Sequence, residues 1–219
     1  MTTVYLIRHS LQLREKGIMN VEESDQLINE KIILSVEGEE KAKEISEIDE
    51  LQNVDVIWSS SYVRAKQTAK YIAEKNKLDI NIDSRLNERK LGDLNDLKGL
   101  GKNKQHSFVE EQLLDDNLKN SLGESLIDVQ KRMDSVISKI VLDNKNKRIV
   151  IVSHGAALKF YLRKFCKLNK DIKLEFNNGV LDFPSPCIIK LIINDDKVID
   201  IKNIMIKMMK YSYIKIKQI

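Results

Sequence analysis

The strongest constraint on the fold comes from two continuous apolar, β-branched runs, each of which ends in a histidine. The first is VYLIRHS at residues 4–10, and the second is IVIVSHG at residues 149–155. Such runs are typical of strands that are buried on both faces of a parallel sheet. Ligands bind outside the carboxyl ends of the strands in open α/β sheets. His9 and His154, two of the three histidines in the chain, are therefore expected at a ligand site.

Strand-like and helix-like segments alternate along the chain. Strands are predicted at 3–7, 54–58, 80–82 and 149–152, and helices at 35–48, 62–76, 126–140 and 156–166. Residues 187–193 and 198–201 are typical of a hairpin. Repeated βα units predict an α/β fold, a three-layer sandwich with a mostly parallel central sheet, helices on both faces and an antiparallel edge strand.

The length of 219 residues fits a single domain over residues 1–219. Residues 92–123 are polar, contain several glycines and show little periodicity, which favours a cap or excursion over the sheet. Residues 204–219 form a basic C-terminal tail whose end alternates like an edge strand with solvent-facing lysines. A tail that touches a membrane is the less favoured reading.

Composition argues against several classes of protein. Charged residues make up 32% of the chain, but the net charge is only +4, and aromatic residues make up 5%, so a nucleic-acid partner is not expected. Cys166 and Cys187 are isolated, which disfavours a disulfide framework or a zinc knuckle. We see no signal peptide and no apolar run long enough to span a bilayer, so a cytoplasmic enzyme is expected.

Arg8 and His9 stand side by side at the predicted end of the first strand. A guanidinium is permanently charged and can hold two oxygens of a phosphate or carboxylate. A neutral imidazole is a nucleophile near neutral pH. Together they indicate a site in which the arginine binds a phosphoryl group and the histidine attacks it. A surface arginine beside a hydrogen-bonded histidine is the alternative for this dipeptide alone.

Arg64 falls in the first turn of the helix predicted after Ser59 and Ser60. Helix N-termini favour anions, and an arginine normally prefers the opposite end, so Arg64 is expected to meet a ligand there. A solvated surface arginine is the alternative. His154 is followed by Gly155, which permits a close backbone approach where a helix begins.

Glu88, in the string RLNERKLGDL, is a candidate proton donor for an alkoxide leaving group. An ion pair with Arg85 or Arg89 is the alternative. A zinc site at His9 and His154 would need a third ligand, and neighbouring Arg8 would repel a cation, so no metal is expected.

Taken together and in order, these strings resemble the histidine phosphatase superfamily, also called phosphoglycerate-mutase-like. The resemblance rests on Arg8-His9-Ser10, LSVEGEEKA (34–42), SSSYVRAKQTA (59–69), Leu86 with Glu88 and Gly92, Gly123–Ser125 and Val152–Gly155. It covers residues 3 to 193. The resemblance implies that His9 is the nucleophile that becomes a phosphohistidine, and that Glu88 is the general acid and later the base.

The resemblance also implies a phosphate-binding pocket made of Arg8, Arg64 and His154, to which His9, Ser10 and Gly155 contribute. A protonated His154 and two guanidiniums would offset the charge of a phosphate dianion, so neither a metal nor a cofactor is implied. The same cations should keep the attacking nitrogen of His9 unprotonated.

The sequence departs from the family pattern at a few positions. Glu15 stands where mutase-type members have an asparagine, with Arg14 or Ser10 as substitutes for the lost phosphate contact. Ser61 replaces a proline, and Asn95 a glycine. Lysines of the polar segment are candidates for a second anionic group, although a solvated loop is favoured: Lys98, Lys102 and Lys104.

The favoured function is hydrolysis of a small phosphorylated metabolite through a phosphohistidine intermediate, by an enzyme of the histidine acid phosphatase type. A 2,3-bisphosphoglycerate-dependent phosphoglycerate mutase is the first alternative. The segment after His9 departs from the mutase pattern, and the 92–123 excursion is short, which favours hydrolysis. The alternative from another class is an inactive phospho-ligand-binding protein. A homodimer is left open, and the physiological substrate is not specified.

Overall fold

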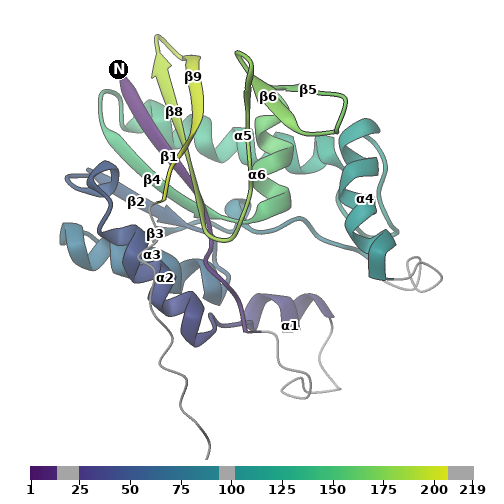
Figure 1. Ribbon diagram of the computed structural model, residues 1–219, viewed down its shortest axis with the longest axis horizontal. Coiled ribbons are helices and arrows are strands. Elements are labelled where there is room, and N and C mark those ends of the chain that lie inside the picture. Colours follow the sequence, from purple (N-terminus) through teal and green to yellow (C-terminus); the bar gives the residue numbers. More distant parts are fainter. Residues whose placement is uncertain (14–24, 94–101, 207–219) are drawn as a thin grey trace, which may run out of the picture.

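A six-stranded sheet lies at the centre of the computed structural model, which describes residues 1–13, 25–93 and 102–206. The order is β3-β2-β4-β1-β8-β9 (Figure 1). Its strands are β1 (Thr2–Arg8), β2 (Val56–Ser59), β3 (Ile80–Ile82), β4 (Arg148–Ser153), β8 (Cys187–Asn194) and β9 (Lys197–Ile204). The first four pair in parallel, whereas β8 pairs antiparallel with both β1 and β9. The predicted mostly parallel sheet with an antiparallel edge strand is confirmed.

Helices cover both faces of this sheet, as predicted. α2 (Val36–Ser46) and α3 (Val63–Asn76) lie on one face, and α5 (Leu126–Asp143) and α6 (Gly155–Leu162) lie on the other (Figure 1). Successive side chains of a strand point to opposite faces. Tyr5 and Ile7 of β1 therefore pack with α2 and α3, while Val4 and Leu6 pack with α5 and α6. All four side chains are fully buried, which explains the uninterrupted apolar run.

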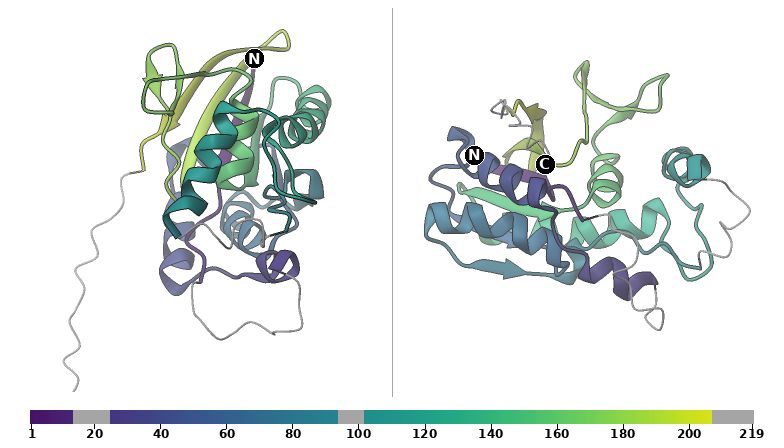
Figure 2. Two further views of the ribbon diagram at one scale, coloured as in Figure 1. Left: turned by 90° about the vertical axis from the view of Figure 1, so that its right-hand side faces the viewer. Right: turned by 60° about the horizontal axis from the view of Figure 1, so that its bottom comes forward.

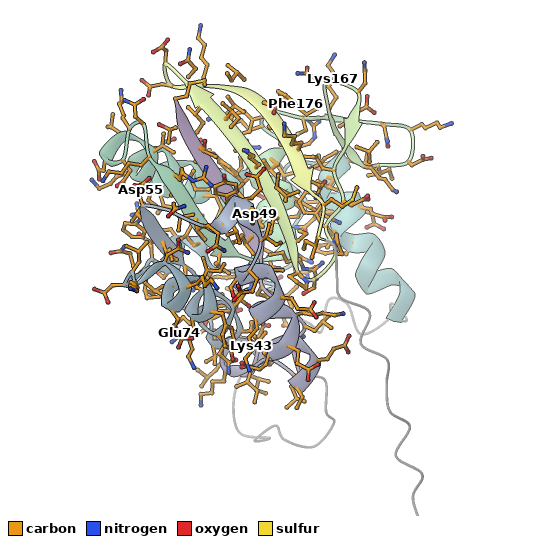
Figure 3. All side chains as sticks on the ribbon, turned by 60° about the vertical axis from the view of Figure 1, so that its left-hand side comes forward. Lys43, Asp49, Asp55, Glu74, Lys167 and Phe176 are labelled. Carbon is orange, nitrogen blue, oxygen red and sulfur yellow. The ribbon has the colours of Figure 1, made fainter. Side chains whose placement is uncertain are left out.

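The outer surfaces of the helices are polar. Figure 3 shows Lys43 of α2 and Glu74 of α3 on the side of these helices that faces away from the sheet, and both residues are exposed. The apolar side chains of the same helices face inward and include Ala42, Ile45, Ala69 and Ile72. The helical periodicity of the sequence thus determines which sides of α2 and α3 pack against the sheet.

Several elements were not expected from the sequence. They are α1 (Asp25–Lys31), the 3₁₀ turns η1 (Asp49–Leu51) and η2 (Ser84–Leu86), α4 (Lys102–Leu114), and a small antiparallel sheet of β5 (Lys167–Leu168), β6 (Leu174–Phe176) and β7 (Gly179–Val180). Each strand of the small sheet has two or three residues, which is too short for a period-two pattern to be recognised. Figure 2 shows α4 and the small sheet on the α5/α6 side of the molecule.

The segment predicted as an excursion with little periodicity contains a helix, α4. Phe108 and Leu113 of this helix are buried, and Leu113 belongs to the main core beside α5 and α6. The apolar residues of the segment are scattered, and only Phe108, Val109, Leu113 and Leu114 fall within α4, so periodicity averaged over residues 92–123 is weak. The cap assignment of this segment stays a prediction.

Some predictions fall on residues outside the described ranges. These are the substitutions at Glu15 and Asn95, the contact from Arg14, the lysine at position 98, and the basic tail after Ile206. The side chains of Lys102 and Lys104 are also outside the description. Within the described ranges, no helix is long and apolar enough to cross a membrane.

Loss of the cap of α5 should destabilise the protein. The Ser125 side chain accepts a hydrogen bond from the Asp128 N–H at 3.3 Å, and the Asp128 carboxylate accepts one from the Ser125 N–H at 3.2 Å. We expect Ser125→Ala to lower the free energy of unfolding by about 1 kcal/mol, measured by urea denaturation. Ser138→Ala, at an exposed position of the same helix, is the control and should cause no loss. Equal stability of the two variants would contradict the assignment of this cap.

Candidate active site

The register of β1 against β4 brings the two strand-end histidines together. Arg8 pairs with Ser153, and the His9 N–H donates to the Ser153 carbonyl oxygen over 2.9 Å. The Ser60 N–H, at the end of β2, donates to the Val152 carbonyl oxygen over 3.0 Å. The carboxyl ends of β1, β2 and β4 therefore meet at one edge of the sheet. The His9 and His154 rings lie edge to face with their centroids 5.1 Å apart.

The contacts of His9 determine which ring nitrogen carries the proton. Nδ1 lies 2.7 Å from the Ser10 carbonyl oxygen, which can only accept, so Nδ1 must donate. The Nε–H of Arg64 lies 3.1 Å from Nε2 of His9 and can only donate. Nε2 of His9 therefore carries a lone pair, held beside a guanidinium. A ring held in this tautomer presents Nε2 as its nucleophilic atom.

The surroundings of His9 keep its imidazole neutral. Its side chain is only 5% exposed. Burial lowers the pKa of His9 from 6.5 to about 3, and the neighbouring charges of Arg64 and Arg8 act in the same direction. The hydrogen bond to the Ser10 carbonyl opposes this shift only in part. Nε2 of His9 is thus unprotonated at neutral pH, as the sequence analysis expects.

Arg64 lies in the first turn of α3, where the sequence places it, and it is almost completely buried. Its Nη1 donates to the Asn29 carbonyl oxygen of α1 over 2.5 Å. The guanidinium also stacks over the Tyr62 ring, with 5.0 Å between Cζ and the ring centroid. Burial lowers the pKa of Arg64, and the Glu88 carboxylate opposes that effect. These contacts orient the guanidinium without neutralising it.

Arg8 approaches the same edge from β1. Its Nη1 donates to the Phe183 carbonyl oxygen, and its Nε is buried without a hydrogen-bond partner among the described residues. A Cβ built on Gly155 would lie 3.0 Å from both Cζ and Nε of Arg8. The missing side chain at Gly155 therefore leaves room for the Arg8 guanidinium at the start of α6.

His154 is fully buried and occupies the residue position just before α6, without a side-chain hydrogen bond to the helix N-terminus. Its Nε2 lies 2.7 Å from Oγ of Ser60, whereas its Nδ1 is buried without a partner in the described part of the chain. Burial, followed by the charges of His9 and Arg64, holds the pKa of His154 well below its ordinary value of 6.5. The neutral form of His154 is therefore favoured, and the protonated His154 that the resemblance implies beside a phosphate dianion stays a prediction. The cations around it oppose a further positive charge unless an anion is present.

Unpartnered polar atoms and uncompensated positive charge gather at this edge. Ser10 adds a buried Oγ that has no partner among the described residues, while its N–H donates to Oγ1 of Thr68 over 3.0 Å. Within the described ranges, neither Arg8 nor Arg64 has a carboxylate oxygen within ion-pair distance. Buried polar groups without partners require an explanation, and buried cations are normally paired. A bound oxyanion would satisfy both conditions.

Glu88 lies on the other side of the first turn of α6. Its Oε1 accepts hydrogen bonds from the N–H groups of Ala157 at 2.8 Å and Arg89 at 2.9 Å, and its Oε2 accepts one from Ala156 at 3.2 Å. Oxygen acceptors are favoured at a helix N-terminus, where backbone N–H groups are free. The alternative of an ion pair between Glu88 and Arg85 is not seen, because Arg85 pairs with Asp83.

Arg132 of α5 holds the segment that carries Glu88, a contact that the sequence analysis did not identify. Its guanidinium donates to the carbonyl oxygens of Arg85, Asn87 and Glu88 at 2.7, 2.9 and 3.3 Å. The same group forms a two-pronged ion pair with Glu124, at 2.7 and 2.9 Å, and both side chains are largely buried. The Gly-Glu-Ser string quoted for the resemblance contains Glu124, but its partner in α5 is visible only in the fold.

Asn87 and Ser60 were also missed as site residues. Oδ1 of Asn87 accepts from Oγ of Ser60 at 2.8 Å, and Ser60 in turn contacts His154. The same Oδ1 of Asn87 also accepts from the backbone N–H and the hydroxyl of Ser61, at 2.9 and 3.0 Å. A proline at position 61 would have neither donor. The Ser61 departure therefore adds hydrogen bonds that orient the Ser60–His154 pair.

The fold thus brings the predicted site residues to one edge of the sheet: Arg8, His9, Ser10, Arg64, Glu88, His154 and Gly155. Their chemical roles stay predictions. No group of three or more histidine, cysteine, aspartate or glutamate residues in the described ranges could hold a metal ion. The chemistry of the site, with two guanidiniums beside two imidazoles, is that of an anion site.

Comparisons with known proteins agree with this architecture. A sequence model of the histidine phosphatase superfamily (branch 1) matches residues 4–185. A protein named "Probable phosphoglycerate mutase GpmB" from Erwinia tasmaniensis is 28% identical over 160 residues, which are 72% of each chain. A mycobacterial glucosyl-3-phosphoglycerate phosphatase structure superimposes with a TM-score of 0.64, at 21% identity over 92% of this chain and 96% of that one.

A further solved structure is a phosphoserine phosphatase variant from Entamoeba histolytica in complex with phosphoserine. It superimposes with a TM-score of 0.58, at 22% identity over 91% of this chain and 94% of that one. At these identities, the structural likeness shows a shared fold.

A methyl group at position 155 should weaken anion binding. Because its Cβ would lie 3.0 Å from the Arg8 guanidinium, Gly155→Ala should displace that side chain. We expect the dissociation constant for inorganic phosphate, measured by calorimetry, to rise about tenfold, the loss expected for one weakened charge-assisted contact. The variant should remain folded, as judged by circular dichroism, because the atoms that must move belong to the long Arg8 side chain and not to the backbone. Unchanged phosphate affinity would mean that Arg8 does not bind the anion.

Acid should destabilise the protein through the two site histidines. Their pKa values are lower in the folded chain than the ordinary 6.5, so below about pH 6.5 the unfolded chain binds more protons, for His9 down to about pH 3. The free energy of unfolding should therefore fall as the pH drops below 6.5, by up to about 1.4 kcal/mol per pH unit for each histidine. Urea denaturation at pH 7.5 and 5.5 measures this slope. His9→Gln and His154→Gln should each flatten it, and slopes parallel to that of the native protein would disprove the assignment.

Proposed function

Because the chain belongs to the histidine phosphatase superfamily, we propose that it hydrolyses the phosphomonoester of a small phosphorylated metabolite through a phosphohistidine intermediate. One observation carries this proposal above the others. Nε2 of His9 is unprotonated and accepts a hydrogen bond from Nε of Arg64 over 3.1 Å, and the pKa of His9 is lowered to about 3. A nucleophile that is neutral at physiological pH, held beside a cation that would bind the phosphoryl oxygens, suits attack on phosphorus.

The proposal assigns phosphate binding to Arg8, Arg64, His154, Ser10 and Gly155. The guanidiniums supply two positive charges against the two negative charges of the phosphate. The buried Nε of Arg8, Oγ of Ser10 and Nδ1 of His154 supply polar contacts that the described chain leaves unused. A dianion would also raise the proton affinity of His154, so that this side chain becomes a second donor in the complex.

The chemical step would form a bond between His9 Nε2 and phosphorus while the ester P–O bond breaks. Glu88 would give a proton to the departing alkoxide oxygen and become a carboxylate. In the second half of the reaction, a water oxygen would attack phosphorus while Glu88 takes a proton from that water molecule. The P–N bond then breaks, which releases inorganic phosphate and restores His9. Arg132 would act as a positioning residue, because it holds the backbone carbonyl of Glu88.

Phosphoglycerate mutase activity is the second candidate. It is supported by the 28% identity to a protein named "Probable phosphoglycerate mutase GpmB". Both reactions share the phosphohistidine and differ in whether water or a substrate hydroxyl accepts the phosphoryl group. Glu15, in place of the asparagine of the mutase pattern, favours hydrolysis. The homodimer, the cytoplasmic location and the absence of a metal requirement stay predictions.

Replacement of the proposed nucleophile should abolish turnover. We expect native protein to release inorganic phosphate from at least one member of a broad phosphomonoester panel, and His9→Ala to lose at least a thousandfold in kcat because no P–N bond can form. The variant should remain folded, as judged by circular dichroism and thermal melting. Native protein quenched during turnover should carry an acid-labile, base-stable phosphoryl group that His9→Ala lacks. His106→Ala removes the third histidine and should still be labelled.

Each outcome separates the candidate functions. Formation of 2-phosphoglycerate from 3-phosphoglycerate without phosphate release would replace the hydrolase by the mutase. Tight phosphate binding without turnover or labelling would favour an inactive binding protein. Full activity of His9→Ala would refute the nucleophile assignment.

A further inference from the structure

Lys159 is a cation beside the site that the phosphoryl chemistry described above does not use. It lies on α6 one turn after Gly155, and positions i and i+4 of a helix share a face. The Arg8 guanidinium lies where a side chain at position 155 would begin. Side chains of a helix lean toward its N-terminus, so the Lys159 side chain leans back toward the end of α6 that Glu88 and His154 occupy.

The ammonium group of Lys159 contacts the residue that binds Arg8, and it interacts electrostatically with both Arg8 and Glu88. Nζ lies over the Phe183 ring, 5.5 Å from the centroid, and the carbonyl oxygen of Phe183 accepts from Arg8. Burial, followed by the charge of Arg8, lowers the pKa of Lys159, whereas Glu110 and Glu88 raise it. Lys159 thus interacts electrostatically with groups on both sides of the first turn of α6.

No carboxylate of the described chain lies within ion-pair distance of Lys159, although the residue is only partly exposed. Other lysines of the described chain, one partly buried and one exposed, do have such partners. Lys190 of β8 pairs with Glu50 at 2.9 Å, and Lys164, at the end of the α6 region, pairs with Asp134 at 2.7 Å. A half-buried ammonium group that faces the site and lacks a carboxylate is suited to an anionic ligand group.

From this juxtaposition of Lys159 with Arg8 and Glu88, we infer that Lys159 binds a second anionic group on the substrate, located on the part that leaves. The inference rests on the proposed function, because Glu88 marks the leaving-group side only if it protonates the departing oxygen. The substrate class is then a small phosphomonoester whose alcohol carries a carboxylate or a second phosphate. Lys159 is a specificity-determining residue in this account and takes no part in bond making.

Matched substrates test this inference. Glycerol 3-phosphate and 3-phosphoglycerate share a three-carbon skeleton, but only the latter has a carboxylate, and glycerol 1,3-bisphosphate has a second phosphate instead. We expect the native protein to prefer one of the two anionic probes over glycerol 3-phosphate in kcat/KM. In Lys159→Met, which retains most of the apolar stem, this preference should fall about tenfold through KM, the loss of one charge-assisted contact. Lys159→Arg should restore part of it, and Lys164→Met should keep the native preference.

Calorimetric binding of the three probes distinguishes failure of this inference from failure of the proposed function. If nothing is hydrolysed but the anionic probe binds the native protein more tightly than Lys159→Met, the inference holds and the hydrolase fails. A preference that is equal in native protein and Lys159→Met would overturn the inference, whatever the turnover. An equal loss of kcat on all probes would also overturn it, because Lys159 would then act through Glu88 alone.

Discussion

The parallel pairing of β1 with β4 is the interaction on which the rest of the site depends. The register of Arg8 against Ser153 places His9 and His154 directly after two adjacent strands. Both strands are buried on both faces, so a slip of one residue would turn every apolar side chain of β1 to the opposite face. Packing of the cores on the two sides of the sheet therefore fixes the positions of the His9 and His154 rings relative to each other. The geometry of the site is a consequence of packing far from it.

Stability and function make opposite demands at this edge of the sheet. Two guanidiniums are held against buried imidazoles, with no carboxylate of the described chain at ion-pair distance from either. Folding must remove these groups from water without full compensation, which is unfavourable. The same lack of compensation keeps His9 neutral and leaves positive charge available for an anion. Such a site is preorganised, because its donors are aligned before a ligand arrives.

Residues that bear a reactive or charged group at a strand end or a helix start were predictable from the sequence. His9, Arg64 and His154 belong to this class, since the flanking apolar runs show where each strand stops. Arg132 was not predictable, because it lies in the middle of an amphipathic helix and reaches a segment more than forty positions away. The helix α4 was missed because its apolar residues, such as Phe108 and Leu113, are too few to give a periodic signal over a long polar stretch.

The sequence by itself determined the layered α/β architecture and the chemical character of the site, because periodicity and residue type are local properties of the chain. The tertiary structure decided the protonation state of the imidazoles and the contacts of Glu88. A pKa depends on burial and on charges that arrive from other elements, as His154 illustrates: its motif indicates a phosphate ligand, but its complete burial disfavours the charged form. The position of Lys159 beside Arg8 likewise follows from the packing of α6 against β1, which no spacing in the sequence specifies.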